Sequence, residues 1–224
     1  MGTNSHSLTS SPTFPCHMDS PPTPGRVLKT QLLGPLPLVN HYLNRLRIDA
    51  ILAPRIPGPT SAHLSEACCL GVLLRNLQLA REPLYELSLW AGEFRLDRVG
   101  LPPDSDSFLN DNRMGRVLDA LFDADRASVA TEIVVRVAQE FGVSLDRFHN
   151  ESTTVTPQGN YSEATGEFLR GKVTRKALWG HNKNHRPDLK QLQCILTASA
   201  DGAVPVHYRV ANWNTNDSLT HLES

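Results

Sequence analysis

The sequence predicts an α+β protein in which a helical domain comes first and a set of strands follows. Two observations support this prediction. Apolar residues recur at helical spacing from residue 35 to about residue 143. After Gly142 the apolar period changes from about 3.6 to 2, and two apolar runs flank the turn dipeptide Asp201-Gly202. We therefore divide the chain into a tail (1–27), a helical domain (28–143) and a strand-containing domain (144–224).

The tail, residues 1–27, is rich in Ser, Thr and Pro. Such a composition buries too little apolar area to offset the entropy of ordering the chain, so we expect disorder here. The whole chain has 224 residues, 40% of them hydrophobic, and a formal charge of −1. No apolar run reaches the length of a membrane span. The four cysteines form no CxxC pair and no disulfide pattern, so we expect a reducing cytoplasm.

The helical domain is expected to contain five helices. PLPLVNHYLNRLRI begins the first, and SAHLSEACCLGVLLRNLQLA the second, with Ser61 as its N-cap. Pro83 suits the first turn of the third helix, PLYELSLWAGEF. The fourth, NDNRMGRVLDALFDADR, carries an apolar stripe made of Met114, Val117, Leu118, Leu121 and Phe122. The fifth, ASVATEIVVRVAQEFG, ends at Gly142, which is expected to be its C-cap.

About three strands are expected after the helices. FHNESTTV, residues 148–155, has the β-branched residues of a strand. LQCILTASADGAVPVHYRVAN is expected to be a hairpin with a primed turn at Asp201-Gly202. The segment 157–190 is expected to be mostly loop, with a short strand in KALWG.

A basic cluster lies in the segment RGKVTRKALWGHNKNHRPDLK, residues 170–190, which holds a single acid, Asp188. Clustered Lys and Arg attract a phosphate backbone, and the interspersed Trp, His and Asn side chains can stack or hydrogen-bond. The alternative is a solvated basic loop without a partner. The candidate nucleic-acid-binding residues are Arg170, Lys172, Arg175, Lys176, Lys183, His185, Arg186 and Lys190.

Glu151 is a single acid inside the expected strand 148–155. It is the candidate catalytic and metal-binding residue. The alternative is an exposed strand residue, because phosphoryl transfer with two metal ions takes several carboxylates on a rigid frame.

Several motifs in order resemble bacterial insertion-sequence transposases of the DDE type. They are LGPLPLVNHYLNRLRID, LGVLLRNLQLAREPLYELSLWAGEF, LNDNRMGRVLDALFDADR, FHNESTTV, GHNKNHRPDLKQL and SADGAVPVHYRVANWNTND. The resemblance runs from about residue 33 to about residue 218. It implies a helical domain followed by an RNase H-like catalytic domain, with DNA and a full-length transposase as partners. It also implies Mg²⁺-dependent DNA cleavage and strand transfer.

The resemblance assigns the first catalytic acid to Glu151. The family motif is H-N-D-S-T, and its places are filled by His149, Asn150, Glu151, Ser152 and Thr153. Glu replaces Asp, and its extra methylene moves the carboxylate by about one C–C bond. Catalytic sites tolerate a displacement of the reacting groups of only about 0.5 Å. Trp213 replaces the glycine of a family turn, where a bulky residue is strained if φ is positive.

The resemblance implies that the family's second Asp and last Glu would lie beyond Ser224, the last residue of this sequence. We therefore expect the first strands of an incomplete RNase H-like domain. The expected function is that of a truncated DDE transposase that keeps DNA or transposase binding. The alternative is an inactive pseudogene product that binds no DNA.

Overall fold

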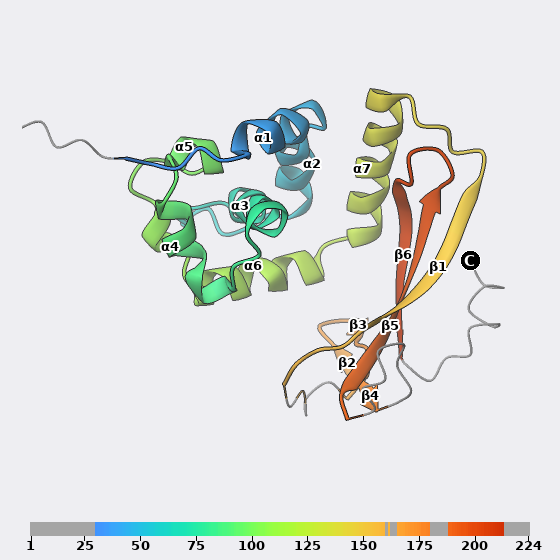
Figure 1. Ribbon diagram of the computed structural model, residues 1–224. Coiled ribbons are helices and arrows are strands. Elements are labelled where there is room, and N and C mark those ends of the chain that lie inside the picture. Colours follow the sequence, from blue (N-terminus) through green and yellow to red (C-terminus); the bar gives the residue numbers. More distant parts are fainter. Residues whose placement is uncertain (1–29, 160, 162–164, 180–187, 213–224) are drawn as a thin grey trace, which may run out of the picture. The chain divides into compact units, whose positions relative to one another are not determined.

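A computed structural model describes residues 30–159, 161, 165–179 and 188–212 (Figure 1). The tail expected at 1–27 lies outside these residues. In the described part of the chain, α-helices are followed by small antiparallel sheets, so the α+β class is confirmed.

Seven α-helices occur in the described residues. They are α1 (Leu36–Arg45), α2 (Ile48–Arg55), α3 (Glu66–Leu79), α4 (Leu87–Gly92), α5 (Leu96–Val99), α6 (Asp111–Asp123) and α7 (Arg126–Phe141). Two 3-10 helices, η1 (Leu84–Glu86) and η2 (Asp106–Phe108), precede α4 and α6. The helix α3 is central, because it contacts α1, α2, α4, α5 and α6. Within the described residues, no helix is long and apolar enough to cross a membrane.

Capping residues mark the starts of α3 and α6 and the end of α7, although one expected cap is wrong. Ser65, and not Ser61, caps α3, where its hydroxyl accepts a hydrogen bond from the Cys68 backbone N–H at 3.2 Å. Asn110 caps α6 in the same way. Gly142 ends α7 with a φ of 66°, which confirms it as the C-cap.

The expectation of five helices missed α2 and α5. Arg47, with a φ of 53°, breaks the helical path between α1 and α2. After Pro83 the chain forms η1 before α4 begins, and α5 is a separate short turn that ends at Gly100 with a φ of 87°.

The core of the helical part is apolar and closely packed. Its fully buried hydrophobic side chains are Leu36, Cys69, Val72, Leu87, Ala91, Val99, Leu109, Met114 and Val117. The stripe expected on α6 is partly in this core, since Met114 and Val117 are buried while Leu118 is exposed.

Three long strands form an antiparallel sheet, and β5 (Lys190–Ser199) lies in the middle (Figure 1). β1 (Phe148–Val155) and β6 (Pro205–Asn212) pair with β5 on its two sides. The short strand expected in KALWG is β4 (Leu178–Trp179), which pairs with the start of β5. A separate two-stranded ribbon consists of β2 (Phe168–Leu169) and β3 (Lys172–Val173).

The hairpin β5–β6 forms, but its expected turn is wrong. Residues 200–204 connect the strands, and positive φ values occur at Gly202 (70°) and Ala203 (50°), not at Asp201. A register shift at Thr197/Ala198 changes which residues form the turn. The Asp201 carboxylate instead accepts a hydrogen bond from the Ser144 backbone N–H at 2.8 Å.

Candidate nucleic-acid interface

A groove of about 970 Å³ carries an excess of positive charge. The α6–α7 junction, β3 and β6 line it. Its cations are Arg126, Lys172, Arg175 and Arg209, and its carboxylates are Asp123 and Asp125. Four cations against two acids leave an excess of two positive charges, before counting His207. A groove of this sign attracts a polyanion.

Lys172 is fixed at the C-terminal end of α6. Its ammonium group donates to three consecutive backbone carbonyl oxygens, those of Phe122 (2.5 Å), Asp123 (3.0 Å) and Ala124 (2.7 Å). These carbonyls have no partner within the helix and form the negative pole of its dipole. The ring of Phe122 also lies 5.5 Å from the ammonium and 5.1 Å from the guanidinium of Arg126. Two groove cations are therefore held in place by α6.

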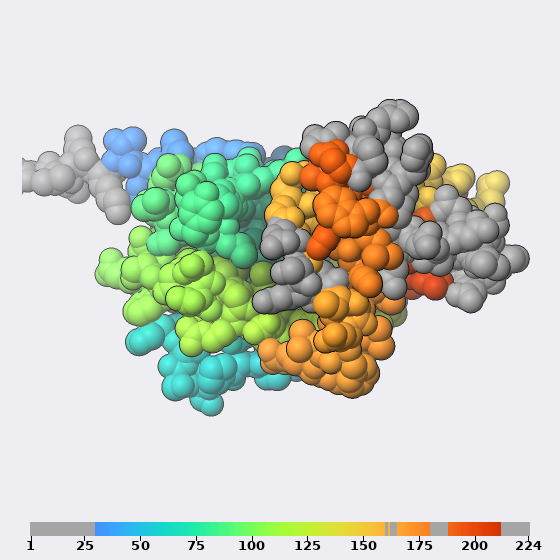
Figure 2. All heavy atoms as spheres, turned by 90° about the horizontal axis from the view of Figure 1, so that it is seen from below, coloured from blue at the N-terminus to red at the C-terminus, as the bar shows by residue number. Residues whose placement is uncertain are grey.

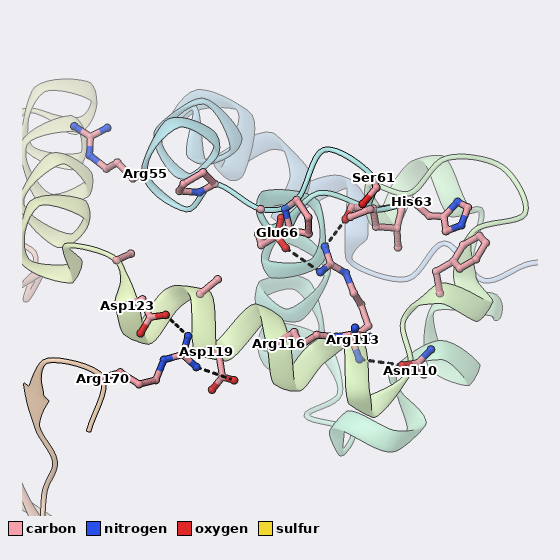
Figure 3. A pocket seen from close by; sticks show the side chains of 18 residues that line it. Arg55, Ser61, His63, Glu66, Asn110, Arg113, Arg116, Asp119, Asp123 and Arg170 are labelled. Atoms are coloured by element: carbon pink, nitrogen blue, oxygen red, sulfur yellow. Dashed lines mark hydrogen bonds and ion pairs between the residues drawn. The ribbon is translucent and has the colours of Figure 1, made fainter. Parts of the chain in front are cut away.

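Arg170 lies at the turn of the β2–β3 ribbon. Arg170 and Gly171 connect the strands with φ values of 49° and 79°, as a primed two-residue turn requires. The guanidinium pairs with Asp119 at 3.2 Å and with Asp123, both on α6 (Figure 3). The Arg170 guanidinium therefore forms its ion pairs with carboxylates of this chain.

The other predicted nucleic-acid-binding residues have different surroundings. Arg175 lines the groove. Lys176 forms an isolated β-bridge with Thr165. Lys190 begins β5, and its ammonium donates to the Tyr161 carbonyl at 2.9 Å. Lys183, His185 and Arg186 lie outside the described residues.

Two groove cations, Arg126 and Arg209, were missed by the sequence analysis. Arg126 is the first residue of α7, and Arg209 lies on β6. Neither belongs to a basic run, and only the fold brings them beside residues 172–175. The break at Asp125 between two amphipathic patterns was the one local signal, because it puts Arg126 at an interhelical junction.

Glu151 lies on β1 and is exposed. It pairs across the sheet with Leu196, which in turn pairs with Tyr208 on β6. Directly paired residues share a face of an antiparallel sheet, so Glu151 stands beside apolar and aromatic side chains.

The described residues do not fit a two-ion metal site. Among them, no group of three or more His, Cys, Asp or Glu gathers closely enough to hold a metal ion. Two bound Mg²⁺ ions need several carboxylates in a fixed frame. Glu151 alone supplies one of the several carboxylates that such a site needs.

Residues 28–135 match the model of a family described as a domain of unknown function, DUF4277, which is commonly found in transposases. The matched stretch includes α1–α6 and the beginning of α7, so it lies within the predicted helical domain. The strands and Glu151 lie outside it. Neither the curated proteins nor the solved structures that were searched gave a match.

Proposed function

We propose that this chain is a DDE-type insertion-sequence transposase protein that binds duplex DNA through the cationic groove. The observation that carries the proposal is the gathering of Arg126, Lys172, Arg175 and Arg209 from three separate parts of the chain. The family match supports the transposase class, because DUF4277 is commonly found in transposases. The motif at 149–153 lies on a strand, β1, as an RNase H-like catalytic domain would require.

The groove would contact the phosphate backbone and not the base edges. Lys and Arg side chains that meet phosphates release counterions, so affinity falls as salt rises. Each contact contributes about −0.9 to the slope of log K against log salt concentration. Three or four groove cations therefore predict a slope of about −3. Such contacts position DNA without reading its sequence.

The test is a salt titration of binding to a fluorescent DNA duplex, measured by anisotropy. We expect Arg126→Glu and Arg175→Glu each to weaken binding and to reduce the slope by about one or more, because each replaces a phosphate-attracting cation by an acid. Arg81→Glu is the matched control, since Arg81 is exposed and does not line the groove.

Three outcomes would contradict the proposal. Affinity that does not change between about 50 and 200 mM salt would exclude a phosphate-binding groove. An equal loss of binding in Arg81→Glu would show that only net charge matters. Absent binding in a cooperatively folding chain would favour the alternative, an inactive product.

We propose binding and not cleavage as the activity of this chain, because the described carboxylates do not assemble a two-ion site around Glu151. DNA nicking in Mg²⁺ or Mn²⁺ that Glu151→Gln abolishes would overturn that part of the proposal. The glutamine variant keeps the size of the side chain and removes its charge, so folding is expected to be unaffected at this exposed position.

A further inference from the structure

The ribbon β2–β3 presents two apolar side chains on one face. Its register pairs Phe168 with Val173 and Leu169 with Lys172. Because side chains alternate along a strand, Phe168 and Val173 share one face of the ribbon and Leu169 and Lys172 the other.

Both members of the apolar pair are largely in water. Phe168 is 71% exposed and Val173 is 62% exposed. The segment lies at the surface in the space-filling view, where residues near 170 are orange (Figure 2). Single exposed hydrophobic residues are common. Phe168 and Val173, however, are paired across the ribbon and so form one apolar patch, which we call the apolar wedge.

The same ribbon is held firmly at its turn. Arg170 pairs with Asp119 and Asp123, and Lys172 with the end of α6. Arg170 also adopts a left-handed φ of 49°, which a residue with a Cβ takes at a conformational cost. These contacts fix the ribbon before any ligand arrives, so less entropy is lost on binding.

The charges beside this apolar wedge indicate what it binds. Val173 itself lines the cationic groove, together with Arg175, Arg126 and Arg209. No acid occurs from residue 168 to residue 179. An apolar wedge next to such a groove suits duplex DNA, where apolar side chains enter between base steps and bend the helix while cations hold the backbone.

We propose that Phe168 and Val173 insert into the duplex DNA that the groove binds and bend it. This inference depends on the proposed function. Arg170 is a positioning residue in this arrangement, because its donors are directed to α6.

The experiment compares Phe168→Ala and Phe168→Trp with the wild-type chain on a DNA duplex labelled at both ends for energy transfer. We expect Phe168→Ala to bind about ten-fold more weakly, to leave the salt slope unchanged and to abolish the bend, because an apolar contact releases no counterion. Phe168→Trp is expected to keep both binding and bending. Tyr85→Ala is the control, since Tyr85 is an aromatic residue with the same 71% exposure outside the groove.

Each result is decisive. Wild-type affinity and bending in Phe168→Ala overturn the inference but leave the groove proposal intact. A reduced salt slope in Phe168→Ala also overturns it, because the side chain would then act through charge. If the wild-type chain binds no duplex, both proposals fail together. Far-UV circular dichroism of Phe168→Ala, compared with the wild-type spectrum, checks that the exposed substitution leaves the fold in place.

Discussion

The buried ion pair between Glu66 and Arg113 connects α3 to α6, and its loss is expected to be costly. The Arg113 guanidinium donates to the Glu66 carboxylate at 2.8 Å and to the Leu64 carbonyl (Figure 3). Side-chain exposure is only 12% for Arg113 and 4% for Glu66. Arg113→Met would leave a carboxylate buried without a cation.

The expected loss of unfolding free energy in Arg113→Met is about 3–5 kcal/mol. At about 2–4 °C per kcal/mol for a chain of this size, the melting temperature falls by about 6–20 °C. Urea unfolding followed by circular dichroism at 222 nm measures the loss, and an unchanged m-value shows that the folded state is otherwise the same.

A double variant separates the ion pair from simple packing. Glu66→Met with Arg113→Met removes both charges and keeps apolar volume, so most of the stability should return. The reasoning fails if Arg113→Met costs less than about 1 kcal/mol. It also fails if the double variant loses the sum of the two single losses, because then the two side chains do not interact.

Three further predictions concern Gly58, Gly115 and the Cys68 thiol. A Cβ at Gly58 would lie 1.5 Å from the Glu66 Oε2, so Gly58→Ala is expected to destabilise by about 1–3 kcal/mol in urea unfolding. Gly115→Ala on α6, where a Cβ meets nothing within 4 Å, is expected to stabilise by about 0.5–1 kcal/mol, and a loss would contradict the helix argument. Burial, with a smaller effect of the neighbouring Cys69, raises the pKa of the Cys68 thiol from 9.0 to about 11. Since the folded state holds this proton longer than the unfolded state, stability is expected to fall as pH rises from 9 to 11. Unfolding of Cys68→Ala should depend less on pH in that interval, and identical profiles would refute the effect.

The sequence predicted the long, regular elements well for local physical reasons. The apolar period of α6 and α7 and the residue Gly142 were enough to place both helices. The strand β1 was placed correctly at 148–155 from its β-branched residues. Each of these signals lies within one helix or strand, so it predicts that element without knowledge of the rest of the fold.

The start of α3 could not be placed locally, because both Ser61 and Ser65 suit an N-cap. Contacts from distant segments decide between them. The His63 ring stacks on the Phe108 ring with centroids 4.2 Å apart, and the Leu64 carbonyl accepts from Arg113. Both contacts hold residues 61–64 outside the helix, and neither is visible in the pattern around Ser61.

The number of charges along a segment does not show which of those charges a ligand can reach in the folded protein. Arg170 looked like part of a basic run, yet its guanidinium pairs with Asp119 and Asp123 from about fifty residues earlier. Arg126 joins the groove from outside that run. Arg170→Glu would place three acids together and loosen the ribbon, so lost DNA binding in that variant would not show a phosphate contact. Arg175→Glu is the more informative substitution, because Arg175 lines the groove, and none of the ion pairs found in the described residues includes it.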